Sequence, residues 1–181
     1  MGWTVKSFGL IVMIVGLGLL GARSGAAQTL EDVKTHPSCT YCGMDRHQFA
    51  HSRMFIEYDD GSSVGVCSLH CAAVDLALNL DKTPVAVKVA DYFTRELIDA
   101  ERAFWVMGGE KPGVMTRRAK WAFGKQEDAE RFIRESGGTA AAFDEVMKAA
   151  YQDMYDDTRM IRDKRKGKGI HRHEHKDHKH N

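Results

Sequence analysis

The sequence predicts an α+β protein made of two small strand-strand-helix-strand units packed together, followed by a C-terminal helix and a disordered tail. Two observations predict this class. Short runs of β-branched and aromatic residues, bounded by Gly, Pro and Asp, alternate with segments of helical apolar periodicity. The order of these segments in the first half of the chain recurs in the second half, which indicates two related units.

The first 27 residues have the pattern of a secretory signal peptide. Lys6 provides a short basic start, residues 8–20 are apolar apart from three glycines, and the small residues at 24–27 provide a cleavage site. This run is short for a membrane span, which needs roughly 20 apolar residues, although an uncleaved signal anchor stays open. We therefore predict a periplasmic protein whose mature chain begins near Gln28 and has no membrane span.

The first unit is expected at about 39–92, after a polar lead-in at 28–38. Its strands are rich in Val, Ile and aromatic residues, and Asp60-Gly61 is a dipeptide typical of hairpin turns. Apolar residues at helical spacing precede a third strand, in which valine alternates with other residues. The predicted elements are strands at 53–59 and 62–67, a helix at 69–80 and a strand at 84–90.

The second unit is expected at about 93–142 and repeats this order. Its helix is strongly amphipathic and should end at Gly137-Gly138. A closing helix is expected from 143 to about 161, since apolar residues follow one stripe there. The predicted elements of the second unit are strands at 97–98, 103–107 and 119–123, a helix at 125–136 and a strand at 139–142.

The charge distribution distinguishes a mildly acidic body from a basic tail. The formal net charge is +1, but residues 162–181 contain eight Lys or Arg and three Asp or Glu. We therefore expect no basic body face for nucleic acid. The tail composition predicts disorder, and its alternating histidines are suited to capturing Cu(II), Ni(II) or Zn(II). These histidines are His171, His173, His175, His178 and His180. The alternative is a solvated basic tail that contacts anionic surfaces.

All four cysteines lie in two short clusters, Cys39-Thr-Tyr-Cys42-Gly-Met44 and Cys67-Ser-Leu-His70-Cys71. Thiolate, thioether and imidazole suit Cu(I) or Zn(II) and suit Mg or Ca poorly. Cys39, Cys42 and Met44 form a three-donor loop, which is sufficient for Cu(I), whereas zinc usually requires four ligands. The first cluster therefore favours Cu(I). The alternative is a structural Zn(II) site made from all four cysteines.

The second cluster falls where a predicted strand ends and a helix begins. Cys67 and Cys71 are four residues apart, with His70 beside Cys71, so the three side chains should lie near one edge of the first helical turns. Two further donors are candidates for ligand exchange. Met115 is in a predicted loop, and His51 follows the first cluster closely.

A redox function is a further alternative for the Cys-x-x-Cys pair, since an exported chain meets an oxidising compartment. A disulfide between Cys39 and Cys42 would close a very small loop and stabilise the fold little. A thiol-disulfide oxidoreductase normally has such a pair at a helix start, whereas this pair precedes a hairpin. No Ser/His/Asp constellation or paired carboxylates can be identified, so we expect a protein that is not an enzyme.

The chain resembles the NosL family, periplasmic accessory proteins of nitrous-oxide reductase that resemble copper chaperones. The first cluster matches the family signature Cys-x-x-Cys-Gly-Met, and Met115 lies near the family's loop methionine. The similarity runs over about 39–150, within a NosL-like domain expected at 39–161. Weaker matches follow in the family order: Val89-Ala-Asp91-Tyr92, Ile98-Asp99-Ala100, Ala122-Phe123 and Gly137-Gly138.

The resemblance implies a two-unit α+β fold and delivery of Cu(I) to nitrous-oxide reductase or its maturation machinery. Two features depart from the family pattern. Many members are lipoproteins, whereas this chain has no cysteine near its cleavage site. The Cys67-x-x-His70-Cys71 cluster and the histidine-rich tail are additional. They leave open whether the client is nitrous-oxide reductase or another metalloenzyme.

Overall fold

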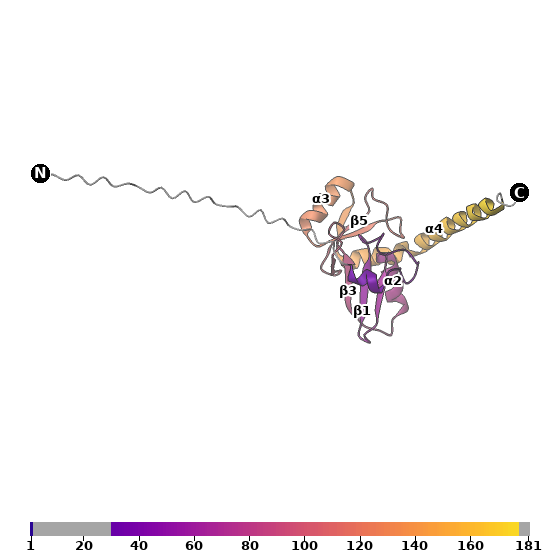
Figure 1. Ribbon diagram of the computed structural model, residues 1–181, viewed down its shortest axis with the longest axis horizontal. Helices are drawn as coiled ribbons and strands as arrows, with labels where there is room; N and C mark the ends of the chain where they lie inside the picture. Colours follow the sequence, from indigo (N-terminus) through magenta and orange to yellow (C-terminus); the bar gives the residue numbers. More distant parts are fainter. Residues whose placement is uncertain (2–29, 178–181) are drawn as a thin grey trace.

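The computed structural model describes Met1 and residues 30–177, with side chains through Lys166 (Figure 1). It is an α+β protein with two antiparallel sheets, which confirms the predicted class. Apart from Met1, the predicted signal peptide lies outside the described residues, and so do His178 and His180 of the tail. None of the helices in the described part combines the length and apolar composition that a bilayer crossing requires.

The first sheet has four strands in the order β2-β1-β3-β4, all paired antiparallel. The hairpin between β1 and β2 turns at Gly61, whose φ of +80° is one that glycine adopts without a steric penalty. A helix, α2, connects β2 to β3 as predicted. The bounds are β1 Met54–Tyr58, β2 Ser63–Val66, α2 Leu69–Leu78, β3 Pro84–Ala90 and β4 Leu97–Asp99.

The second sheet has three strands in the order β6-β5-β7. Its connections repeat those of the first sheet: two antiparallel strands, a helix, and a third strand that pairs with the first. The predicted recurrence of the strand-strand-helix-strand order is therefore confirmed. The bounds are β5 Phe104–Met107, β6 Lys120–Phe123, α3 Gln126–Ser136 and β7 Thr139–Ala141.

The strand expected at 97–98 belongs to the first sheet and not to the second unit. It is β4, and it pairs with β3 in the register Val89↔Ile98. The Asp91 carboxylate accepts hydrogen bonds from the backbone N–H groups of Phe93 and Thr94, so the chain turns back on itself directly after β3. This turn places β4 beside the strand that precedes it.

Two helices differ from the sequence prediction. A short helix, α1 (Glu31–Thr35), lies in the polar lead-in, where the sequence predicts no helix, and ends two residues before Pro37. The closing helix, α4 (Phe143–Asp177), does not end near residue 161 and includes much of the segment expected to be disordered. Residues 162–177 contain no proline, and their lysines and arginines are good helix formers that outnumber the two glycines at 167 and 169. It packs against α2 and β5 and then extends beyond the body (Figure 1).

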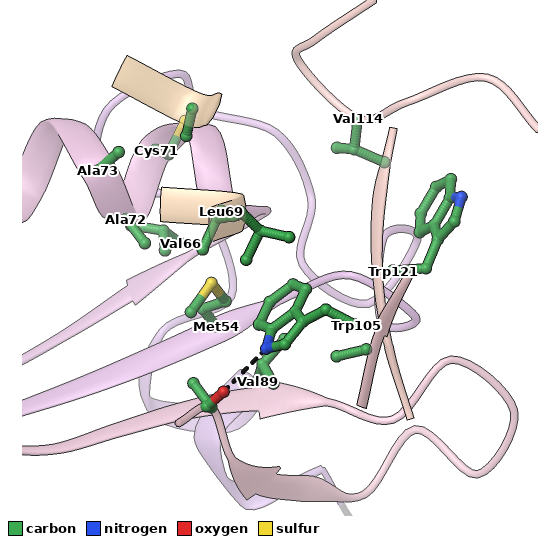
Figure 2. Close-up of a cluster of buried hydrophobic side chains, with 14 of the residues drawn as sticks. Met54, Val66, Leu69, Cys71, Ala72, Ala73, Val89, Trp105, Val114 and Trp121 are labelled. Carbon is green, nitrogen blue, oxygen red and sulfur yellow. Dashed lines mark hydrogen bonds between the residues drawn. The ribbon is translucent and has the colours of Figure 1, made fainter. Parts of the chain in front are cut away.

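A single hydrophobic core joins the two sheets (Figure 2). Met54 and Val89 of the first sheet pack in one cluster with Trp105 of the second sheet, and α2 contributes Leu69. The Trp105 indole N–H donates to the carbonyl oxygen of Ala100 at 2.8 Å, so its polar atom is satisfied inside the core. Because one core supports both sheets, α2 is held firmly at its start, where the second cysteine cluster lies.

Candidate metal centre

The four cysteine sulfurs meet in one place. They all lie within 4.8 Å of one another, with Sγ–Sγ distances of 3.5 Å for Cys42–Cys67 and 3.8 Å for Cys67–Cys71. All four are free thiols. Sulfurs bound tetrahedrally at about 2.3 Å from a zinc ion lie about 3.8 Å apart. The donor set and its spacing therefore fit a thiophilic metal ion.

The first pair of sulfurs is presented by a tight turn. The Gly43 N–H donates to the Cys39 carbonyl at 2.9 Å, and the Cys39 N–H donates to the Met44 carbonyl at 2.8 Å. Gly43 has a φ of +72°, which favours glycine at this position. The Thr40 N–H donates to the Gly65 carbonyl of β2 at 3.2 Å. These bonds fold residues 39–44, the metal loop, onto the edge strand of the first sheet.

Cys67 and Cys71 lie at the predicted junction between a strand and a helix. Cys67 follows the last residue of β2, and Cys71 is in the first turn of α2, with Ser68 as the helix N-cap. Cys67 is 0% exposed and Cys39 and Cys71 are 2% exposed, whereas Cys42 is half-buried. An incoming ligand can therefore reach the cluster at Cys42, while the other three sulfurs are shielded.

The four thiols share their protons unequally. Hydrogen bonds from Cys42, Cys67 and Cys71 lower the pKa of Cys39 well below its ordinary value of 9.0. For Cys42, the hydrogen bond with Cys39 raises the pKa but those with Cys67 and Cys71 outweigh it, giving about 7. Hydrogen bonds with Cys39 and Cys42, together with burial, raise the pKa of Cys67 and of Cys71. These directions favour negative charge on the metal loop over negative charge on the second pair, and a metal ion that binds the thiolates displaces the protons that the cluster shares.

Met44 and His70 each lie within two residues of a clustered cysteine in the chain. Met44 ends the metal loop, and its half-buried side chain packs against the core that includes Cys39. The His70 ring is buried and its Nδ1 lies 3.6 Å from the Asp157 carboxylate of α4. Burial lowers the pKa of His70 although Asp157 acts in the opposite direction, so the imidazole is neutral at pH 7, the form that can ligate a metal.

His51 and Met115 occupy separate environments. The His51 ring lies in an aromatic cluster, with ring centroids 5.7 Å from Tyr92 and 5.6 Å from Trp121. Burial lowers the pKa of His51, and the charge of Arg95 lowers it further. Met115 is half-buried in the loop between β5 and β6 with a φ of +61°. Its two neighbours in the chain line a cavity of about 10 Å³ together with His70, so this loop lies across from the start of α2.

Sequence reasoning missed the buried arginine that joins the two cysteine segments. Arg46 is 0% exposed, and its guanidinium forms an ion pair with Asp32 at 2.7 Å. It also donates to the carbonyl of Val66, the residue before Cys67, at 3.2 Å. Arg53 pairs with the same carboxylate at 2.8 Å. An arginine two residues after the metal loop is the only sequence signal for this role, and no local pattern distinguishes it from a surface arginine.

The long helix α4 also reaches the metal loop. The Arg165 guanidinium donates to the carbonyl oxygen of Cys42 at 3.3 Å. His171, His173 and His175 lie further along this helix, where the structure describes the backbone alone. Metal capture by the tail histidines therefore stays a prediction.

These features define an α+β protein with a preformed thiol-rich centre of the kind that holds a soft metal ion. Residues 30–151 match the family described as NosL, and the chain belongs to this family. The crystal structure of the copper chaperone NosL from Shewanella denitrificans is similar in fold, with a TM-score of 0.50 and 24% sequence identity over 66% of this chain and 94% of that chain. A comparison with curated proteins gives no match.

Proposed function

We propose that this chain is a periplasmic accessory protein that binds Cu(I) at its cysteine cluster and delivers it to a metalloenzyme. The observation that carries the proposal is a cluster of four sulfurs in which three are buried and one, Cys42, is accessible. The similarity of the chain to a copper chaperone and its membership of the NosL family support copper as the ion that is carried. The family also points to nitrous-oxide reductase, or its maturation machinery, as the client. Export depends on the signal peptide predicted from the sequence.

Transfer follows from the unequal burial of the sulfurs. Cu(I) accepts two or three soft ligands, so the ion does not need all four thiolates at once. Cys42 can be replaced by a ligand of the client while Cys39 and the buried pair still hold the ion. Met44, at the end of the same loop, is the thioether that we expect to take part in this exchange, with His70, Met115 and His51 as further candidate donors. No step in this sequence requires the free ion to enter water.

A structural zinc site is the second candidate, and a specific observation favours it. The fourth sulfur completes a tetrahedral donor set, and the Cys67–Cys71 distance of 3.8 Å equals the edge of such a set, about 3.8 Å. A zinc ion there would stabilise the fold without being exchanged. The two functions differ in whether the bound ion can leave while the protein stays folded.

The test is an anaerobic titration of the full chain with Cu(I) in competition with a colorimetric chelator. A variant with the five tail histidines replaced by Ala isolates the body. We expect one tightly bound Cu(I), loss of this binding in Cys39→Ser with the fold retained, and no change in the control Ser38→Ala. Loaded protein should then restore the copper absorption of metal-free nitrous-oxide reductase.

Two results would contradict the carrier function. The first is a chain that holds zinc, excludes Cu(I) and unfolds when zinc is chelated, which is the behaviour of a structural site. The second is an isolated chain with Cys39 and Cys42 permanently joined as a disulfide. Reduction of insulin by the chain, lost in Cys42→Ser, would support the redox alternative.

A further inference from the structure

A buried carboxylate lies one helical turn beyond the second cysteine pair. Asp75 of α2 is 0% exposed and has no cation among the groups that donate hydrogen bonds to its oxygens. Three neutral donors satisfy it: the hydroxyls of Tyr41 and Tyr58, and the amide of Asn79. A buried carboxylate costs several kcal/mol unless it is fully hydrogen-bonded, so each of these donors matters.

The position of Asp75 on α2 is set by its spacing from the metal centre. It follows Cys71 by four residues, so the two side chains lie on the same face of the helix, one above the other. Asn79 comes four residues later and donates to Asp75 Oδ1 at 3.2 Å. One face of α2 therefore carries the Cys71 sulfur in its first turn. The same face carries the hydrogen-bonded carboxylate of Asp75 in the next turn.

The metal loop reaches this acceptor through the residue between its two cysteines. The Tyr41 hydroxyl donates to Asp75 Oδ1 at 2.5 Å. On the other side of the loop, Thr40 bonds to Gly65 of β2 through both its N–H and its hydroxyl, each at 3.2 Å. The loop is thus tied to the strand that precedes Cys67 and to the helix that carries Cys71.

We propose that Tyr41 and Asp75 are positioning residues of the metal centre, whose hydrogen bond holds the sulfurs of Cys39 and Cys42 against the second pair before an ion binds. This role rests on the proposed function, because it takes the sulfur cluster to be a metal-binding site. Preorganised ligands bind more tightly because less motion is lost on binding. Cys42 is the accessible sulfur, so a looser loop should release the ion faster.

Tyr58 provides a matched control. Its hydroxyl donates to the other oxygen of the same carboxylate, but it comes from β1 and not from the metal loop. Tyr41→Phe and Tyr58→Phe each remove one hydroxyl and leave Asp75 short of one donor. Only Tyr41→Phe releases the loop. A purely structural role for the carboxylate would therefore make the two variants behave alike.

The experiment measures Cu(I) release from the full chain, loaded anaerobically, into an excess of chelator. We expect Tyr41→Phe to release Cu(I) about tenfold faster, the order of effect for a lost hydrogen bond to a charged group, and Tyr58→Phe to stay within about twofold of the wild type. The thermal midpoint of metal-free Tyr58→Phe should fall at least as far as that of Tyr41→Phe, because Asp75 Oδ1 keeps the Asn79 amide when the Tyr41 hydroxyl is removed. The Co(II)-loaded absorption bands should change in Tyr41→Phe alone.

Equal release rates in the two variants, or unchanged Co(II) bands in Tyr41→Phe, would overturn the positioning role. If the proposed function is wrong, the experiment gives a different result, which concerns the metal that the wild type binds. If the wild type binds Co(II) or Zn(II) but no Cu(I), the cargo assignment is wrong, and the same comparison of Tyr41→Phe with Tyr58→Phe is made on Co(II) release.

Discussion

The two sheet units have the same arrangement of strands and helix, yet the four-cysteine cluster lies at the first unit. In both, the third strand pairs with the first, giving the orders β2-β1-β3 and β6-β5-β7. The junctions between strand and helix differ in chemistry. Cys67 follows β2, whereas Gly124 follows β6, and the third helical residue is Cys71 in α2 but Asp128 in α3. The repeated unit therefore provides the same backbone arrangement twice. The residues at the strand-helix junction decide whether sulfur ligands are present there.

The units also differ in what surrounds the helix. α2 is buried over most of its length, because α4 packs along it, whereas α3 buries only Ala129, Phe132 and Ser136. The metal loop and Arg46 precede β1 and fold onto the first sheet. The cysteine cluster therefore depends on elements outside the repeated strand-strand-helix-strand arrangement: a loop with two sulfurs, a buried arginine and a covering helix.

We expect the largest loss of stability on removing a buried charge from the first unit. Arg46→Ala leaves the Asp32 carboxylate short of a partner, and breaking a buried pair costs about 3–5 kcal/mol. Arg131→Ala is the matched change in the second unit, where an exposed pair with Asp128 is worth about 1 kcal/mol or less. Chemical denaturation of the metal-free proteins measures both. Similar losses in the free energy of unfolding of the two variants would show that the buried ion pair of the first unit is no more important to stability than the exposed pair of the second.

Metal removal is the next test. An ion that binds only the folded state at 100 times its dissociation constant stabilises it by about 2.7 kcal/mol. We expect the free energy of unfolding of the wild type to rise by about this amount with Cu(I) and to fall again on chelation. Cys39→Ser should show no such rise. A rise that persists in this variant would place the bound ion elsewhere in the chain.

Acid should weaken the first unit through Asp32. Burial alone would raise the pKa of this carboxyl, but the hydrogen bonds and charges of Arg53 and Arg46 lower it below its usual 3.8. A depressed folded pKa contributes stability above pH 3.8, and this contribution is lost as the pH falls through the lower folded value. The stability advantage of the wild type over Asp32→Asn should therefore be constant from pH 7 to 5 and narrow below pH 3.8. A constant gap down to pH 2 would contradict the assignment.

The smallest expected effect concerns the contact between α4 and the metal loop. Arg165→Ala removes the hydrogen bond to the Cys42 carbonyl, which at 3.3 Å and in an exposed position is weak. We expect Cu(I) release to quicken by about twofold with stability unchanged, since a bond worth about 0.5 kcal/mol corresponds to that factor. Lys166→Ala, the exposed neighbour, is the control. Identical rates in the two variants would mean that α4 does not restrain the loop.

Much of the fold could be predicted because it is encoded locally. The alternating valines of β3 and the amphipathic spacing of α3 specify their elements without reference to the rest of the chain. The sheet to which β4 belongs was not encoded in this way, since it depends on the turn at Asp91. The extension of α4 past Ile161 could not be predicted in this way, because the charged, histidine-rich composition that predicts disorder also contains lysines and arginines that favour a helix.

The positions of the soft donors along the chain, and the strand-helix junction that carries the second cysteine pair, follow from the sequence alone. The fold is needed to show that four sulfurs meet, that Cys42 is the one half-buried cysteine among them, and that His51 lies in an aromatic cluster. The difference lies in the distance along the chain over which each signal acts. Periodicity reports the neighbours of a residue within a turn or two, whereas the meeting of Cys39 with Cys67 depends on contacts such as Thr40 with Gly65, which join distant segments.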